Sequence, residues 1–142
     1  MKALQFDTEP VAVALQTVFD NRPAQDDRVL VIGCGVIGNL VVQALRALAP
    51  RCFVAAIEPS AFAARLARRL GADEVVPDGD VFDRTARITG ARVYRPMIGP
   101  PIPMGGFERV YDTVGHAATL NLGMRLLSAL GTLSMEIGRA HV

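Results

Sequence analysis

Apolar and polar residues follow two different periods along the chain. Short runs of consecutive apolar residues are typical of strands buried on both faces of a parallel sheet. They alternate with longer segments in which apolar residues recur every three or four positions, as in helices. The runs predict strands at 29–32, 53–58, 74–76, 109–112 and 132–137. The longer segments predict helices at 11–19, 36–49, 60–70, 81–89 and 117–129.

Some of these helices also carry signals for a boundary or for the face that meets the sheet. The first is expected to begin at Thr8, a capping hydroxyl that Glu9 and Pro10 follow. In the second, the polar residues share one face and are expected to point outward: Asn39, Gln43 and Arg46. In the third, the stripe expected to face the sheet is Phe62, Leu66 and Leu70. Its solvated stripe is expected to be Arg65, Arg68 and Arg69.

The segment 92–106 breaks the alternation. It contains four prolines and three glycines, which predicts a long irregular loop with little regular structure. Loops of this length inside a compact domain are usually functional or mobile.

Strands that alternate with helices predict an α/β fold with a parallel sheet and right-handed crossovers. A glycine-rich turn after the first strand indicates a Rossmann doubly wound sheet of order 3-2-1-4-5, in which the sixth strand of that fold is missing. We expect one domain over residues 1–142. It comprises a lead-in helix and loop (1–27), a core (28–138) and a short tail (139–142).

The composition excludes several classes of function. The chain has 142 residues, of which 51% are hydrophobic, and a formal net charge of +1, so it is globular and offers no basic surface for nucleic acid or for a membrane. No apolar run approaches the roughly 20 residues that span a bilayer, and no secretory signal precedes the first helix. We therefore expect a cytoplasmic protein. The two cysteines, Cys34 and Cys52, are expected to be small buried residues rather than a disulfide or metal ligands.

The glycine-rich turn is the clearest candidate for chemistry. Gly33 permits a tight exit from the first strand, Gly35 lets a pyrophosphate approach the backbone, and Gly38 lets the helix pack closely on the strand. The first-turn amides, near Val36 and Ile37, would point at the anion along the positive end of the helix dipole. This pattern predicts a site for the ADP half of a dinucleotide.

Glu58 follows Gly38 by twenty residues, at the end of the second strand. A carboxylate there can accept hydrogen bonds from both ribose hydroxyls and would repel a 2′-phosphate, so we expect NAD(H) in preference to NADP(H). The alternative is a carboxylate that only caps the next helix. A methyltransferase would also place an acid here, but its usual pattern has glycine at position 37, where this chain has Ile. An FAD site usually uses an N-terminal strand, whereas a helix precedes this one.

At this point the chain closely resembles the cofactor domain of the medium-chain, zinc-type alcohol dehydrogenases, in particular those like threonine and sorbitol dehydrogenase. The similarity runs from about Thr8 to Gly138. It comprises the lead-in helix, the nucleotide turn, a helix that ends in Leu-Gly-Ala-Asp, and the last two strands with the turn between them. The five matching segments are residues 9–15, 27–38, 67–75, 107–115 and 131–138.

The resemblance implies roles for further residues. In the family, the backbone after the fourth strand lies under the cofactor, which here would be Thr113, Val114 and Gly115. The backbone after the fifth strand holds the nicotinamide carboxamide, which here would be Ile137 and Gly138.

The chain also departs from the family. It lacks the catalytic domain that supplies the zinc ligands, and neither His116 nor His141 can replace them, so we expect no catalytic residue and no metal site in this chain. The basic residue that often follows the acid by five positions is Ala63 here, and Arg65 lies two positions further on. The chain ends soon after Gly138, which we interpret as an excised domain or a truncated gene product.

The interpretation is therefore an NAD(H)-binding domain of an oxidoreductase that transfers hydride between an alcohol or carbonyl and the nicotinamide, incomplete for catalysis as given. The alternative is a non-catalytic nucleotide-binding module with a regulatory or redox-sensing role. A neighbouring gene or an extended reading frame that carried the zinc ligands would favour the first. Without a sixth strand the fifth becomes an unpaired edge, so we also expect a homo-oligomer.

Overall fold

The computed structural model describes residues 2–77 and 79–135, and its centre is a five-stranded parallel sheet. The strand order is β3-β2-β1-β6-β7, which is the predicted order once the strands of a separate hairpin, β4 (Arg92–Tyr94) and β5 (Ile102–Met104), are set aside. The sheet strands are β1 (Arg28–Ile32), β2 (Phe53–Ile57), β3 (Glu74–Val76), β6 (Phe107–Asp112) and β7 (Leu127–Met135). The α/β fold class with Rossmann order is confirmed.

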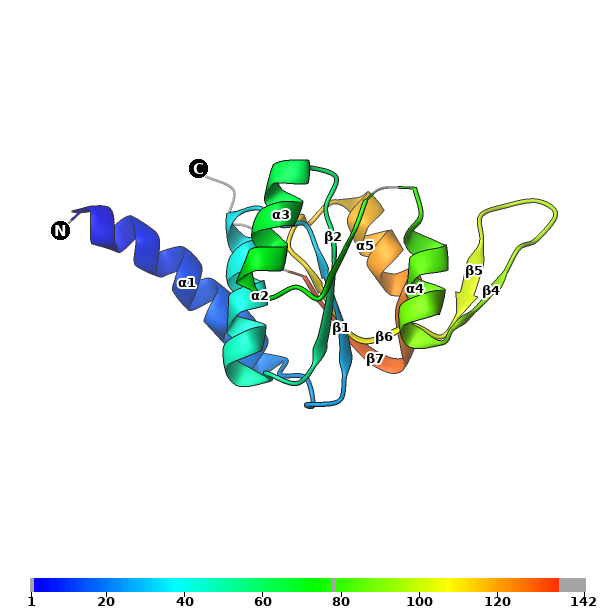
Figure 1. Cartoon of the computed structure of the whole chain (residues 1–142), viewed down its shortest axis with the longest axis horizontal. Helices are drawn as coiled ribbons and strands as arrows, with labels where there is room; N and C mark the ends of the chain where they lie inside the picture. The colour runs from blue at the N-terminus through cyan, green and yellow to red at the C-terminus, as the bar shows by residue number, and fades with distance from the viewer. Residues whose placement is uncertain (1, 78, 136–142) are drawn as a thin grey trace.

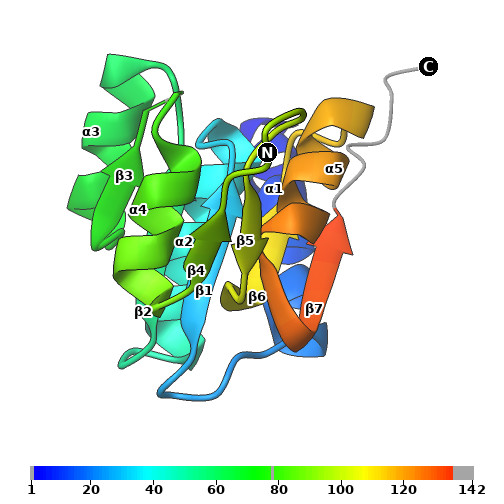
Figure 2. The same ribbon diagram turned by 90° about the vertical axis from the view of Figure 1, so that its right-hand side faces the viewer.

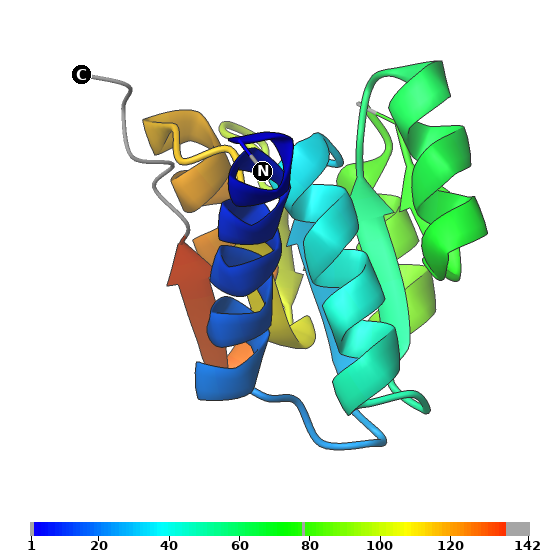
Figure 3. The same cartoon turned by 90° about the vertical axis from the view of Figure 1, so that its left-hand side faces the viewer.

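Helices cover both faces of this sheet (Figure 1). Three helices lie on one face: α1 (Lys2–Asp20), α2 (Val36–Leu48) and α3 (Ala61–Leu70), which Figure 3 shows side by side. The other face carries α4 (Val81–Thr89) and α5 (Ala117–Arg125). Strand β1 serves both layers, because Val29 and Val31 pack in one core cluster while Leu30 and Ile32 pack in the other. Burial on both faces explains why this strand is a continuous apolar run. In the described part of the chain, no helix combines the length and the apolar character that crossing a membrane requires.

Helix α1 begins earlier than the sequence predicts. It runs from Lys2 and continues through Pro10, so the predicted start at Thr8 is wrong. A proline inside a helix removes one backbone hydrogen bond, but the bonds on either side and tertiary packing can carry the helix past it. Here Ala14 and Val18 are almost fully buried, which holds the second half of α1 in place.

The segment predicted as an irregular loop forms a β-hairpin. Strand β4 (Arg92–Tyr94) pairs antiparallel with β5 (Ile102–Met104), and Val93 lies opposite Pro103 (Figure 2). The prediction was therefore wrong at both ends of the segment and correct for the connecting residues 95–101. A proline is compatible with a strand when its missing N–H faces away from the partner, as at the outer edge of a two-stranded ribbon.

The last helix is shorter than the sequence predicts. Helix α5 ends at Arg125 instead of near Ala129, and β7 begins at Leu127, which pairs with Phe107. The register then shifts, so that Thr132 lies opposite Arg109, and Leu130 has a φ of 66° in the bulged part of the strand. Leu126, which is fully buried, is the single residue between α5 and β7. Within the described residues, β7 pairs only with β6 and lies at the sheet edge, as expected for the fifth strand.

Candidate functional site

The candidate site lies at the carboxyl ends of β1, β2 and β6. The chain leaves β1 towards β2 through α2, whereas β6 lies on the other side of β1, so the strand order reverses at this point. Open α/β sheets bind ligands at such switch points. The turns are tied to one another, because Gly33 N donates to Ile57 O at 2.9 Å and Thr113 N donates to Ile32 O at 3.0 Å.

Two glycines of the turn between β1 and α2 are required by the backbone itself. Gly33 has a φ of +88°, a conformation that disfavours side chains, and a Cβ there would lie 2.6 Å from Val114 Cγ2. A Cβ on Gly38 would lie 1.9 Å from the carbonyl oxygen of Gly33, so α2 can approach the turn closely only without that atom. Both observations agree with the close packing that the sequence predicts for these positions.

Gly35 differs from the other two because its surroundings are open. Its φ is −72°, and no atom lies within 4 Å of the place that a Cβ would occupy. The first hydrogen bond of α2 runs from Asn39 N to Gly35 O at 3.0 Å, so the amides of Val36 and Ile37 precede the helical ladder. An open backbone surface at the positive end of a helix is suited to an anion.

Glu58 connects the glycine turn to the start of α3. Its Oε1 accepts a hydrogen bond from Cys34 N at 2.9 Å, and its Oε2 accepts one from Ser60 N at 2.8 Å. Ser60 in turn caps α3, with its hydroxyl oxygen accepting from Ala63 N. The capping alternative considered for Glu58 is thus present in part. A carboxylate has about four acceptor positions, so these two bonds leave capacity for ligand hydroxyls.

Asp112, which sequence reasoning missed, is the best-buried carboxylate of the described residues, with 0% exposure. Its Oδ1 accepts from Val114 N at 3.0 Å and from Gly115 N at 3.2 Å, and its Oδ2 accepts from Thr119 Oγ1 at 2.9 Å. The carboxylate thereby fixes the turn that follows β6. The sequence does contain a signal for this role: Asp112 is an acid at the end of a buried strand, directly before a turn of small residues.

The structure brings most of the predicted residues together. Thr113 Oγ1 lies 2.8 Å from Ile32 O and 3.0 Å from Gly33 O, which fastens the turn after β6 to the glycine turn. The side chain of Val114 lies against the same turn, because a Cβ on Gly33 would lie only 2.6 Å from Val114 Cγ2. Ile137 and Gly138 lie outside the described residues.

The thiol of Cys34 lies inside this arrangement and is 1% exposed. Burial, and to a lesser extent the Glu58 carboxylate, raises the pKa of this thiol to about 12, so it stays protonated near neutral pH. Cys52 is also buried, and burial raises the pKa of its thiol as well. Both cysteines are free, as expected for structural residues.

Two predictions about helix faces are wrong in part, although Gln43 and the three arginines of the solvated stripe on α3 are exposed as predicted. Asn39, expected to point outward, is 6% exposed, and its Nδ2 donates to Cys34 O at 2.8 Å. On α3, Ala64 and Ala67 are buried against the sheet, whereas Phe62 is 71% exposed. The small alanines allow a closer approach than the predicted stripe of large side chains would.

Phe62 and Leu66 therefore line an apolar groove, whereas Leu70 of the predicted stripe is partly buried against the core as expected. The groove has a volume of about 590 Å³ and opens beside Gly35. Its apolar lining comes from α1, α2 and α3, and includes Val11, Val36, Leu40, Phe62, Leu66 and Leu70.

Metal chemistry has no evident place among the described residues. Nowhere in the described ranges do three or more His, Cys, Asp or Glu side chains gather as a metal site would require. His116 is exposed and lies at the N-cap of α5, in the turn where the sequence placed it. His141 is outside the described residues.

Comparisons with known proteins agree with this geometry. Residues 36–137 match the family model described as zinc-binding dehydrogenase. A zinc-binding dehydrogenase structure from Sinorhizobium meliloti 1021 bound to NADP has 29% sequence identity and a TM-score of 0.70, over 89% of this chain and 34% of that one. The 2R,3R-butanediol dehydrogenase of Bacillus subtilis has 28% identity and a TM-score of 0.71, over 93% of this chain and 35% of that one.

A third structure, an Escherichia coli CFT073 alcohol dehydrogenase complexed with NADH, has a TM-score of 0.73 over 89% of this chain and 34% of that one. Its identity is 22%, which supports the fold alone. The chain thus spans about a third of the length of the solved structures it matches. No curated protein sequence matched the chain.

Proposed function

We propose that this chain, which belongs to the zinc-binding dehydrogenase family and has the fold of its cofactor-binding domain, binds NAD(H). The bound cofactor would serve hydride transfer to or from an alcohol or carbonyl compound. The observation that carries the proposal is the pairing of an open helix N-terminus at Gly35 with Glu58, whose carboxylate is hydrogen-bonded to the same turn. The S. meliloti structure bound to NADP supports a nicotinamide dinucleotide as ligand.

The pyrophosphate would lie at Gly35. The space that a Cβ would fill is free there, and the backbone amides of Val36 and Ile37 stand at the positive end of α2. Gly33 and Gly38 do not contact the ligand in this proposal. Their role is to bring the turn and the helix close enough for those amides to be presented.

Glu58 would accept hydrogen bonds from the adenosine ribose. Its hydrogen bonds with Cys34 N and Ser60 N fix the carboxylate at the end of β2, which lowers the entropy cost of binding. The negative charge disfavours a 2′-phosphate, and we therefore propose a preference for NAD(H) over NADP(H).

The nicotinamide half would extend over the turn at Thr113, Val114 and Gly115, which Asp112 holds in place, towards Ile137 and Gly138. When bound, the cofactor supplies or accepts the hydride. This chain binds and orients it, and we assign no catalytic residue within the chain. The described residues do not form a site for the zinc ion that the family name implies, so no step is assigned to a metal here.

The test is a fluorescence titration of the 142-residue chain with NADH and with NADPH, repeated on Glu58→Gln. Gln keeps one acceptor oxygen for the turn and removes the charge, so it is a better probe than Ala. Asp26→Asn is the matched control, because Asp26 is an exposed carboxylate in the loop before β1, at the opposite end of the strands.

We expect NADH to bind at least about tenfold more tightly than NADPH to the unaltered chain, and Glu58→Gln to remove most of this difference, because a charge-assisted hydrogen bond contributes about 1.5–3 kcal/mol. Asp26→Asn should leave the ratio unchanged. Equal affinities of the unaltered chain for the two cofactors would contradict the role of Glu58. Tight NADH binding that survives Gly35→Asp would contradict the phosphate site.

A further inference from the structure

One peptide group lies between the two turns of the candidate site. It joins Gly33 to Cys34 directly after β1, and the open backbone at Gly35 follows it. Because a trans peptide group is planar, its carbonyl and its N–H point in opposite directions, and a partner at each end fixes its orientation. The orientation of this group determines how the chain enters Gly35 and the first turn of α2.

Each end of this peptide group has a partner on a different strand end. The carbonyl oxygen, Gly33 O, lies 3.0 Å from Thr113 Oγ1, in the turn after β6. The amide, Cys34 N, donates to Glu58 Oε1 at 2.9 Å, at the end of β2. Strands β6 and β2 lie on opposite sides of β1, so the peptide group is held from both sides of the point at which the strand order reverses. Hydrogen bonds that share a peptide group in this way polarise and strengthen one another.

The Thr113 hydroxyl has two acceptors within reach and one hydrogen to donate. Ile32 O lies 2.8 Å from Thr113 Oγ1, and Gly33 O lies 3.0 Å from it. Ile32 O also accepts from Thr113 N at 3.0 Å, so this carbonyl keeps a donor when the hydroxyl turns to Gly33 O. The pairing of β1 with β6 is a backbone ladder that ends with Ile32 opposite Asp112. The hydroxyl is therefore free to hold the glycine turn, since the two strands are joined without it.

The surroundings of the hydroxyl fix its place. The buried carboxylate of Asp112 accepts two backbone N–H groups of the turn that carries Thr113, which holds this turn in one conformation. On the other side, a Cβ on Gly33 or on Gly38 would lie 3.1 Å from Thr113 Oγ1. The hydroxyl thus lies directly against the two glycines that bring α2 close to the turn.

We propose that the Thr113 hydroxyl is a positioning group for the pyrophosphate of the dinucleotide. It contacts no ligand atom itself. It holds the Gly33–Cys34 peptide group at the carbonyl end while Glu58 holds it at the amide end, so that the backbone at Gly35 is presented to the anion in one arrangement. A binding site that is ordered in advance loses less entropy when the ligand binds. This role rests on the proposed function and makes phosphate binding depend on a side chain from a different strand.

The test compares Thr113→Ala with Thr113→Ser in the 142-residue chain. Both variants lack the methyl group of Thr, and they differ from each other only in the hydroxyl. Thr113→Val is a second variant without the hydroxyl, and it keeps the branched shape. Thr132→Ala is the matched control, because the Thr132 hydroxyl accepts from Arg109 on the neighbouring strand pair, away from the two turns.

The probes are ADP, which carries the half of the dinucleotide assigned to Gly35 and Glu58, and NADH. Their affinities are measured by titration calorimetry at a temperature at which circular dichroism shows each protein fully folded. Under this condition a lower global stability alone leaves the affinity unchanged, so a merely structural role of Thr113 would not alter the result.

We expect Thr113→Ala and Thr113→Val to bind ADP and NADH about fivefold more weakly, by the same factor for both ligands, as the loss of one hydrogen bond predicts. Thr113→Ser and Thr132→Ala should bind both ligands as the unaltered chain does. A loss confined to NADH would place the effect of the hydroxyl at the nicotinamide half and overturn the proposal. Equal affinities of the Ala and Ser variants for ADP would overturn it as well.

The amide resonance of Cys34 in ¹H–¹⁵N spectra tests the link without any ligand. It should move in Thr113→Ala and stay in place in Thr113→Ser, and an unmoved resonance in Thr113→Ala would contradict the proposed link. An unaltered chain that binds neither ADP nor NADH contradicts the proposed function and this role of Thr113 together. A chain that binds both, with no difference between the Ala and Ser variants, contradicts the role of Thr113 alone.

Discussion

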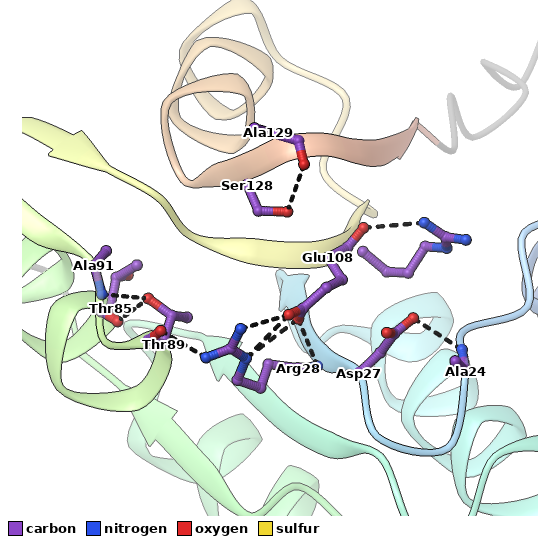
Figure 4. A network of polar contacts seen from close by, with 10 residues as sticks. Ala24, Asp27, Arg28, Thr85, Thr89, Ala91, Glu108, Ser128 and Ala129 are labelled. Carbon is purple, nitrogen blue, oxygen red and sulfur yellow. Dashed lines mark hydrogen bonds and ion pairs between the residues drawn. The ribbon is translucent and has the colours of Figure 1, made fainter.

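Glu108 accepts hydrogen bonds from both the backbone and the side chain of Arg28, which joins the starts of β1 and β6 (Figure 4). Arg28 N lies 2.7 Å from Glu108 Oε2, and Arg28 Nη2 lies 2.5 Å from Oε1. The same guanidinium donates through Nη1 to Thr89 O at 2.6 Å, at the end of α4. This network lies at the amino end of the sheet, away from the candidate site, so it can be altered without touching that site.

The pairing predicts a contribution to stability that depends on pH. Burial acts to raise the pKa of Glu108, but hydrogen bonds from Arg28 outweigh it and lower the pKa below its usual value. A carboxyl whose pKa is lower in the folded state stabilises the fold above the unfolded pKa of about 4.3, and this stabilisation is lost as the pH falls through the folded pKa. Glu108→Gln should therefore lower the free energy of unfolding by about 1–2 kcal/mol near pH 7, and by less near pH 3.

Urea unfolding followed by circular dichroism at both pH values measures this difference. Asp26→Asn is the control, because Asp26 is an exposed carboxylate in the loop before β1. This substitution should change the free energy of unfolding little at either pH. A loss of stability that is as large near pH 3 as near pH 7 would contradict the assignment to the ionised carboxylate.

We expect substitutions at two glycines of the turn to have opposite effects on stability. Gly35→Ala should leave the free energy of unfolding within about 0.5 kcal/mol, because its φ of −72° and open surroundings accept a methyl group. It should nevertheless weaken NADH binding at least about tenfold, since the methyl group occupies the proposed phosphate position. Gly38→Ala should destabilise the fold by about 3 kcal/mol or more, because its Cβ would lie 1.9 Å from Gly33 O.

Thermal unfolding and NADH titration of the two proteins separate the roles. If Gly35→Ala bound NADH as well as the unaltered chain, the phosphate would not lie at this glycine. If Gly38→Ala kept full stability, the close approach of α2 to the turn would not be required.

We expect removal of the Asp112 carboxylate to lower the free energy of unfolding more than its conservative replacement by Asn does. Asp112→Ala leaves the amides of Val114 and Gly115 without their acceptor, whereas the Thr119 hydroxyl can still donate to His116 O, so we expect a loss of about 3 kcal/mol. Asp112→Asn keeps an acceptor oxygen for the two amides, and its amide can donate to the hydroxyl, so the loss should be about 1 kcal/mol.

Denaturant unfolding measures both values, with Asp83→Ala as the control for an exposed carboxylate on α4. Equal losses for the Ala and Asn variants would show that charge, not the acceptor geometry of the turn, is what Asp112 supplies.

The cysteines predict slow reaction with a thiol reagent in the native protein. Cys34 and Cys52 are 1% and 2% exposed, and burial raises the pKa of each thiol, to about 12 for Cys34. We expect little labelling by dithionitrobenzoate up to about pH 9, and rapid labelling of both thiols in concentrated guanidinium chloride. Ile98→Cys, which places a thiol on the exposed hairpin tip, should react at once and serves as the positive control. Rapid labelling of the unaltered native chain would show that the turn around Cys34 opens.

The sequence by itself determined the parts of this protein that depend on local chemistry. The apolar run from Val29 to Ile32 predicts a central strand that is buried on both faces. The glycines after it predict a tight turn, and the structure shows why they are needed: one has a positive φ and another allows the close approach of a helix. The alternation of strands with helices predicts a parallel sheet, and the glycine-rich turn after the first strand predicts its order. The placement of Glu58 at the end of β2 follows from the same local pattern.

Only the tertiary structure decided which side of an element meets which neighbour. A helical period shows that Phe62 and Leu66 share a face, but the closer packing of Ala64 and Ala67 decided which face is buried. Asn39 turns inward and donates to the carbonyl oxygen of Cys34 in the adjoining turn, a bond that the helical spacing of polar residues does not predict. The bulge in β7 depends likewise on its pairing with β6, a strand about twenty residues earlier in the chain. A one-dimensional pattern records the spacing of residues, whereas burial and hydrogen bonding depend on what the folded chain brings beside them.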